Sequence, residues 1–489
     1  MEQKVNEKTL SLGTKPLFPL LLSMAIPGLV GSLTTYLYRT VDQIFVGNFV
    51  GRNALGGISV LSPFNNVIIA LSLFITVGGA SMISLAMGRG EYQKANKLFT
   101  NVIIQAILMA GIVSIAFYVF ADPFVSLCGA KEGTETYDYA VTYLKIIVFG
   151  QVFNMLNQGL AAIIRSEGAA KYSMFANIIG AICNVILDYI LIVLVGMGVS
   201  GAAIATVVSQ MIGAVFSAVY FFTGRSTLKW AGFQVVDFKQ MVTVAKMGIA
   251  PSIFQMLSFV TNIIMNKSLQ YYGDLDPVYA LIGGGELCIS AVSIVNTVDS
   301  FIVSTTSGVN QALSPVLSYN YGAKKYSRVR NASLIGQAMA FSMALVIWLF
   351  MMLAPEFVVN LFSSGDEALI QYGAMAMRVC KCFALFNGYQ MLVSMYFSAI
   401  GKPQVATLVS FSRHGIFLIP AMVILPKFFG LMGVLYANAV SDGCSMIVVT
   451  YMYIREMRRL KGLKDGQEAD IRDKKYKLTL RGKEAQETA

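Results

Sequence analysis

Charged residues are scarce in this sequence: Asp, Glu, Lys and Arg make up 13% of its 489 residues, whereas hydrophobic residues make up 56%. A soluble domain carries about 25% charged residues, because its surface has to be covered by side chains that water solvates. The scarcity of charge therefore excludes a soluble protein, and the apolar composition excludes an intrinsically disordered chain. An integral membrane protein with many spans remains.

Histidine and cysteine are also rare. His414 is the single histidine, and the six cysteines are too scattered to form a zinc site with it. Most of the cysteines lie within apolar runs, so we expect free thiols instead of a disulfide framework. The GxxxxGK[ST] pattern of an ATP-binding P-loop is absent. We therefore expect no cofactor and no enzymatic activity, with an ion gradient as the energy source.

The apolar residues form long uninterrupted runs. A transmembrane helix needs about 20 mainly apolar residues, and the sequence contains twelve such runs. No signal-peptide cleavage pattern follows the polar N-terminal segment, so we expect the first span to remain as an anchor. The predicted spans are 17–46, 54–85, 97–121, 135–163, 170–195, 199–222, 241–271, 279–318, 331–354, 367–398, 404–427 and 431–454.

Basic residues are distributed unequally among the predicted loops. If the N-terminus lies in the cytoplasm, the outer loops contain only Arg52, Lys131 and Lys427 among their Lys and Arg residues. Cytoplasmic loops of membrane proteins carry the excess of Lys and Arg, so we expect both termini in the cytoplasm and the chain in the cell membrane. The same distribution accounts for the net charge of +11 without nucleic-acid binding, for which no basic soluble domain is present.

The polar segment 224–240 divides the predicted spans into two sets of six. Pro27 and Pro251 lie at corresponding points of the two halves, as do Gly168 and Gly401. An even number of spans in each half gives a parallel repeat, which is a transporter architecture. We predict an all-α membrane protein with twelve transmembrane helices in two pseudo-symmetric six-helix lobes. Its segments are a cytoplasmic tail (1–16), an N-lobe (17–223), a cytoplasmic linker (224–240), a C-lobe (241–455) and a charged cytoplasmic tail (456–489), disordered from residue 461 onward.

A few acidic residues lie within the predicted spans, where a charge costs at least about 2.5 kcal/mol. Asp42 lies about 8 Å, and Asp188 about 12 Å, below the outer ends of their spans. Asn184 lies one turn before Asp188 on the same helical face. Thr206 lies about 8 Å deep on the returning span. These four residues are therefore expected to meet in the outer part of the N-lobe.

The acids of this group occur in one half only, because the corresponding positions of the other half hold Asn266 and Pro420. Carboxylate, amide and hydroxyl oxygens are hard ligands that suit Na⁺. Alternatively, burial beside a like charge lets one Asp hold a proton near neutral pH. The simpler interpretation of each acid is a hydrogen bond to a neighbouring helix. The candidate cation-coupling residues, and the metal ligands if the ion is Na⁺, are Asp42, Asn184, Asp188 and Thr206.

Glu286 follows three consecutive glycines in the eighth predicted span. It is either a helix-packing hydrogen-bonding residue or a counter-charge for a cationic substrate in the C-lobe. We assign Glu286, Asn157 and Gln311 as candidate substrate-binding residues. Arg413 and His414 are interpreted as interhelical hydrogen-bond donors rather than as proton relays.

Several short motifs follow one another along residues 15–455. They are Pro27, VDQIFVG at 41–47, ALG at 54–56, RSEG at 165–168, Asn184 with Asp188, GVNQ at 308–311, SYNYGA at 318–323, GKP at 401–403, Pro420, and Gly430 with Gly433. None of them is decisive alone, but in their order and spacing the sequence resembles the multidrug and toxic compound extrusion (MATE) family, and most closely its DinF-like and Gram-positive multidrug branches.

The resemblance implies a monomeric efflux antiporter in the lipid bilayer that exchanges H⁺ or Na⁺ for small organic cations, built as a V-shaped pair of six-helix lobes. It implies a cation site at Asp42, Asn184, Asp188 and Thr206, and a link between Glu286 and drug binding. A NorM-like branch instead carries the ion on acids in spans seven and ten. The corresponding stretches here, near 255–258 and 390–391, have no acid.

A flippase for lipid or polysaccharide precursors, a distant relative with similar lobes, is the alternative function. Such proteins tend to carry cationic central cavities for anionic headgroups. The basic residues within the predicted spans form no obvious single motif, so the sequence favours the antiporter. They are Arg39, Lys145, Lys246, Lys267, Arg378, Lys381 and Arg413.

Overall fold

The structure is a computed structural model that describes residues 7–363 and 366–467, and within these ranges all regular structure is helical. The residues before 7 and after 467, which hold most of the tail expected to be disordered, lie outside the described part. In the first half the helices are α1 (Glu7–Thr14), α2 (Leu17–Phe45), η1 (Val46–Val50), α3 (Arg52–Val60), α4 (Ser62–Gly88), α5 (Tyr92–Val119), α6 (Ala121–Leu127), α7 (Glu135–Ser166), α8 (Ala170–Asp188), η2 (Tyr189–Leu194) and α9 (Gly198–Phe222).

The second half begins after a short connecting helix, η3 (Phe233–Val235). Its first helix begins within the predicted linker, so that linker is shorter than expected. The helices are α10 (Phe238–Leu275), η4 (Tyr279–Ile282), α11 (Gly284–Gly322), α12 (Tyr326–Leu353), α13 (Pro355–Ser363), α14 (Glu367–Cys380), α15 (Leu385–Ala399), α16 (Pro403–Phe411), η5 (Ser412–Leu418) and α17 (Ile419–Gly462).

Ten helices in the described ranges are long and apolar enough to cross a membrane, or eleven if α14 and α15 form one span. The predicted span 367–398 is not one straight helix, because α14 and α15 meet at a 45° bend. The Trp348 indole donates a hydrogen bond of 3.0 Å to the Lys381 carbonyl oxygen at this bend. The last two predicted spans fall in one 60-residue stretch, Pro403–Gly462. That stretch is interrupted at Gly430, whose φ of 55° favours glycine.

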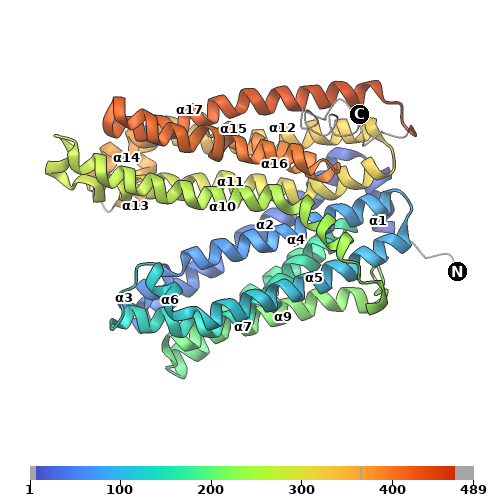
Figure 1. Ribbon diagram of the computed structural model, residues 1–489, viewed down its shortest axis with the longest axis horizontal. Coiled ribbons are helices and arrows are strands. Elements are labelled where there is room, and N and C mark those ends of the chain that lie inside the picture. The colour runs from blue at the N-terminus through green and yellow to red at the C-terminus, as the bar shows by residue number, and fades with distance from the viewer. Residues whose placement is uncertain (1–6, 364–365, 468–489) are drawn as a thin grey trace, which may run out of the picture.

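The two halves form separate bodies that meet at one end of the molecule and diverge toward the other (Figure 1). At the meeting end, α4 packs on α10 and α11, and α2 packs on α11. Glycines allow these backbones to approach closely. A Cβ atom on Gly78 would lie 2.0 Å from the Val244 carbonyl oxygen, and one on Gly248 would lie 2.0 Å from that of Phe74. Such contacts are typical of membrane helices that pack through small residues.

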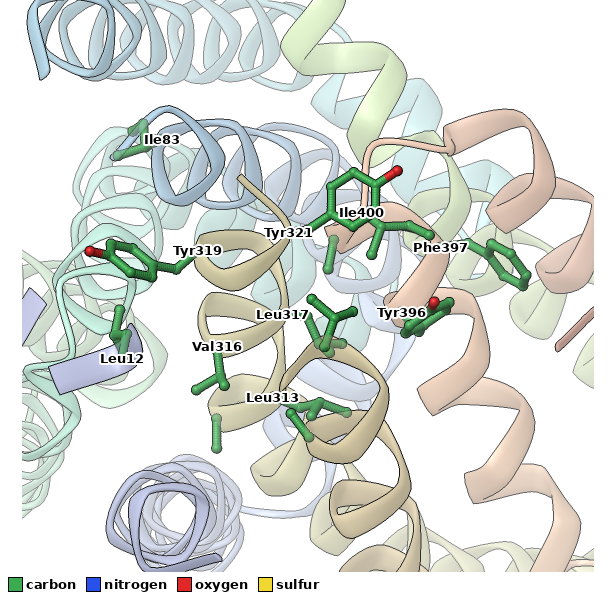
Figure 2. Packing of buried hydrophobic residues seen from close by; sticks show 14 of the residues in the cluster. Leu12, Ile83, Leu313, Val316, Leu317, Tyr319, Tyr321, Tyr396, Phe397 and Ile400 are labelled. Carbon is green, nitrogen blue, oxygen red and sulfur yellow. The ribbon is translucent and has the colours of Figure 1, made fainter. Parts of the chain in front are cut away.

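The buried apolar clusters follow the same division. The largest cluster joins both halves at the meeting end, where Leu12 and Ile83 lie with Leu313, Tyr319 and Tyr396 (Figure 2). A second cluster contains residues of the C-terminal half alone, and a third contains residues of the N-terminal half alone. The halves therefore share a core at one end only.

Helix α1 lies at the meeting end, within the segment that we predicted to be a polar tail (Figure 1). Its Leu12 is fully buried. The Asn320 amide donates a bond of 2.9 Å to the Leu12 carbonyl oxygen, and Lys325 donates one of 2.8 Å to that of Gly13. Thr9 donates a bond of 3.4 Å to the carbonyl oxygen of Glu167, which belongs to the N-terminal half. Residues 7–14 thus form a helix that contacts both halves and links them. The polar character of this segment did not predict such a structural role.

Candidate cation site and substrate cavity

The predicted cation-coupling residues come from three packed helices of the N-terminal half. Asp42 lies on α2, Asn184 and Asp188 lie on α8, and Thr206 lies on α9. Helix α8 packs on both α2 and α9. Asn184 and Asp188 are fully buried, whereas Asp42 and Thr206 are 8% and 9% exposed. The Asp42 and Asp188 carboxyl groups are near enough to interact electrostatically.

Both acidic helices change their winding shortly after the acid. The π-helix η2 begins at the residue after Asp188, and the π-helix η1 begins four residues after Asp42. Short π-helical segments within α-helices occur frequently at functional sites. The two segments pack on each other.

Most oxygen atoms of this group have no hydrogen-bond partner among the described residues. They include one carboxylate oxygen of Asp42, both of Asp188 and the amide oxygen of Asn184. The Thr206 hydroxyl donates a bond of 3.0 Å to the Ala202 carbonyl oxygen, so its own oxygen can only accept further bonds. Buried polar atoms without partners are costly and rare. This set of oxygens fits a small hard cation or a shared proton.

Tyr143 on α7 also belongs to this site, and the sequence analysis missed it. Its side chain is 8% exposed, bonds to Thr206 and interacts with both the Asp42 and Asp188 carboxyl groups. Tyr143 is one of several aromatic residues on α7, and no motif distinguishes it. Only the packing of α7 on α9 brings it to the acids.

A cavity of about 450 Å³ lies between the two halves. Helices α2, α4, α7, α8 and α9 line one side, and α10, α11, α15 and α16 line the other. Asp42 lies one turn beyond the cavity wall and Asp188 lies two turns beyond it. Arg39 lines the cavity three residues before Asp42, and Ala181 lines it seven residues before Asp188. The cation site therefore adjoins the cavity without opening directly into it.

Two of the three predicted substrate-binding residues line this cavity. Asn157 accepts a bond of 2.7 Å from Ser217, and Gln311 donates one of 3.0 Å to Ser32 across the halves. Glu286 is not among the lining residues, because it lies exposed in the first turn of α11, at the end where the halves diverge. The structure therefore does not bring Glu286 to the cavity that holds Asn157 and Gln311.

The described residues that line the cavity include two charged side chains, and both are arginines. Arg39 is exposed, whereas Arg165 is half-buried and donates a bond of 2.7 Å to Ser173. The other polar lining residues are neutral amides and hydroxyls. They are Ser32, Thr35, Tyr36, Tyr38, Thr76, Asn154, Asn157, Gln158, Ser166, Asn177, Ser209, Gln210, Gln255, Ser304, Ser307, Asn310, Gln311, Ser314, Gln390, Ser394 and Ser410.

Asp299 and Asp442, two buried acids of the C-terminal half, are paired with bases, in contrast to Asp42 and Asp188. Lys381 lies 2.9 Å from Asp299, and Arg413 lies 2.5 Å from Asp442. His414 contacts Thr261 on α10 at 3.3 Å. Arg413 therefore joins two helices, as its interpretation as an interhelical donor requires. These two buried carboxylates are held in ion pairs, unlike Asp42 and Asp188.

Comparison with known families identifies the chain. The MatE family model matches residues 27–190 and 251–424, one segment in each half. The chain belongs to the MATE family. Multidrug export protein MepA from Staphylococcus haemolyticus is 25% identical over 442 residues, which cover 89% of this chain and 93% of that protein. MepA from Staphylococcus aureus (strain bovine RF122 / ET3-1) is 24% identical over 445 residues, covering 90% and 94%.

Solved structures of MATE transporters share the fold. The MATE multidrug transporter DinF-BH superposes with a TM-score of 0.84 at 31% identity, covering 95% of this chain and 100% of that chain. An outward-facing MATE transporter of the MOP superfamily gives a TM-score of 0.85 at 22% identity, covering 94% and 100%. The present chain is thus a multi-pass MATE family efflux transporter, as the resemblance implied.

Proposed function

We propose that this MATE transporter is an antiporter that couples the entry of H⁺ or Na⁺ to the export of small organic cations. The observation that carries the proposal is the buried pair Asp42 and Asp188 beside a cavity shared by both halves. Three of the four carboxylate oxygens of this pair have no hydrogen-bond partner among the described residues. A membrane protein retains unpaired intramembrane acids where they bind or relay ions. Sodium, if it is the coupling ion, is held by the carboxylate, amide and hydroxyl oxygens of Asp42, Asn184, Asp188 and Thr206.

The proposed architecture is twelve transmembrane helices in two six-helix lobes, working as a monomer. Eleven spans are obtained by joining α14 to α15. The twelfth follows from the Pro403–Gly462 stretch, because 60 residues of helix extend about 90 Å, far more than a bilayer core of about 30 Å. The break at Gly430 divides this stretch into an outgoing and a returning span. Both termini then lie in the cytoplasm, and the halves diverge toward the outside.

Transport follows from a difference in ion affinity between two states. In the outward-open state a cation binds the acid pair and neutralises it. Helix α2, which contains Pro27 and packs on both α8 and α11, then repacks, and the substrate is released outside. The unloaded transporter opens inward and takes up substrate from the cytoplasm or the inner leaflet. The ion has to bind one state better than the other for this coupling to operate.

Ethidium efflux from proteoliposomes, driven separately by H⁺ and Na⁺ gradients, tests the proposal. We expect gradient-driven efflux in the wild type and its loss in Asp188→Asn. Asp138→Asn is the matched control, because Asp138 is an exposed carboxylate at the start of α7 in the same half. Efflux in Asp188→Asn equal to that of the wild type contradicts the coupling site. Absence of efflux in the wild type under both gradients contradicts the antiporter.

A flippase for anionic lipid-linked precursors is a second candidate, favoured by the charges of the cavity. Arg39 and Arg165 line it, and no carboxylate does so among the described residues. A guanidinium suits a phosphate by bidentate hydrogen bonding. Translocation of a fluorescent polyprenyl-pyrophosphate lipid in the same proteoliposomes, with no gradient-driven ethidium efflux, is the result that favours this function.

A further inference from the structure

Arg39 is an unexpected residue in the cavity of a cation exporter. It lies on α2 one turn before Asp42, and its exposed side chain lines the cavity. Within residues 7–363 and 366–467, Arg39 forms no ion pair. In the C-terminal half, by contrast, the buried bases Lys381 and Arg413 are each paired with an acid. A positive charge at this wall repels a cationic substrate unless a negative charge compensates it.

The groups that surround Arg39 connect it to the acid pair. Its guanidinium interacts with Tyr38 and Tyr36 of α2 and with Tyr143 of α7. Tyr143 in turn interacts with the Asp42 and Asp188 carboxyl groups. Residues three apart on a helix lie on the same face, so Arg39 is within reach of Asp42 by side-chain rotation alone. The titratable groups that act on Arg39 are these tyrosines, and Asp42 lies one turn further along the same helix.

We propose that Arg39 is the residue through which cation occupancy of the acid pair sets the affinity of the cavity for cationic substrate. When Asp42 and Asp188 are ionised, they attract and compensate the guanidinium, and the cavity accepts a cationic substrate. When a cation neutralises them, the charge of Arg39 is left uncompensated at the cavity wall, and the substrate is expelled. Cation binding to the acid pair therefore lowers the affinity of the cavity for substrate. Antiport requires this negative coupling between the two ligands.

This inference rests on the proposed antiport and adds a positioning residue to it. Arg39 binds neither the coupling ion nor, in the unloaded state, the substrate. It also accounts for the presence of Arg39 among the described cavity-lining residues without a change of substrate class. Arg165 differs from Arg39 because it lies at the end of α7, away from the acid pair, and is held by Ser173.

The test is ethidium binding to the purified full-length protein, measured by fluorescence polarisation with the acid pair unloaded and loaded. High pH without Na⁺ gives the unloaded state, and low pH or added Na⁺ gives the loaded state. We expect loading to weaken wild-type binding by about 5- to 150-fold, the usual range of coupling between two sites. In Arg39→Gln we expect tight binding in both states, and Arg39→Lys should restore most of the difference. Binding of an uncharged dye of similar size should be unchanged by Arg39→Gln.

Arg165→Gln is the matched control, because it removes a cavity arginine that lies away from the acid pair. It should change ethidium affinity in both states by the same factor and leave their ratio unchanged. A wild-type ratio in Arg39→Gln overturns the inference while the antiporter stands. Absence of any loading effect in the wild type contradicts the proposed antiport itself. Thermal melting of each variant verifies that it is folded.

Discussion

The ion pair between Lys381 and Asp299 allows a test of how the C-terminal half is held together. The two side chains are 8% and 13% exposed, and the Lys381 nitrogen lies 2.9 Å from one Asp299 oxygen. The other Asp299 oxygen has no partner among the described residues. At this separation the attraction amounts to about 6 kcal/mol for an effective dielectric constant of about 20. Desolvation of the two charges offsets most of it.

Replacing Lys381 alone should therefore destabilise the protein more than replacing both partners. Lys381→Met leaves a buried carboxylate unpaired, which costs about 3–5 kcal/mol of unfolding free energy. Asp299→Leu leaves a buried ammonium group and should cost about as much. The double variant removes both charges, and we expect its stability to lie near that of the wild type.

Unfolding of the four proteins in detergent, followed by tryptophan fluorescence, measures these differences. The expected order is wild type and double variant together, with both single variants well below them. This non-additivity is characteristic of two residues in direct contact. A double variant whose loss equals the sum of the single losses would refute the reasoning, because the side chains would then act independently.

Two further predictions concern the end where the halves meet. Glu167 accepts hydrogen bonds from the backbone N–H groups of Thr227 and Leu228, and its burial raises the pKa of its carboxyl group. The stability that Glu167 contributes should therefore be lost as the pH rises from the ordinary pKa of Glu through the raised pKa of the folded state. Melting temperatures across pH should show this slope in the wild type and not in Glu167→Gln. Gly78→Ala should open the meeting end, because the added Cβ clashes with the Val244 carbonyl. Spin-label distances between the halves should lengthen in this variant and not in Gly111→Ala, whose Cβ meets no atom within 4 Å.

The helices and the acid site were predictable from the sequence for one physical reason. A bilayer requires long apolar runs, and against them a single carboxylate such as Asp42 or Asp188 is conspicuous. Helical periodicity then places Asn184 beside Asp188, and the return of the chain brings Thr206 to the same depth. The structure places all four on neighbouring helices, whereas their role in coupling stays a prediction.

Features that depend on how helices pack were not predictable. Tyr143 and Arg39 acquire their surroundings only when α2, α7 and α8 are assembled. Glu286 and the glycine run before it were expected within a span, but the run lies at the start of α11, where the acid is exposed. At the bend, the Lys381 carbonyl oxygen accepts a hydrogen bond from Trp348, which belongs to another helix and is distant in the sequence.

The central claim is that the acid pair exchanges a cation for the substrate. The most direct measurement is the number of H⁺ or Na⁺ ions released when ethidium binds to the purified protein, obtained by calorimetry in buffers of different ionisation enthalpy and by displacement of radioactive Na⁺. We expect release of one of these ions in the wild type and none in Asp42→Asn or Asp188→Asn. Ethidium binding to the wild type without release of either ion would contradict the account.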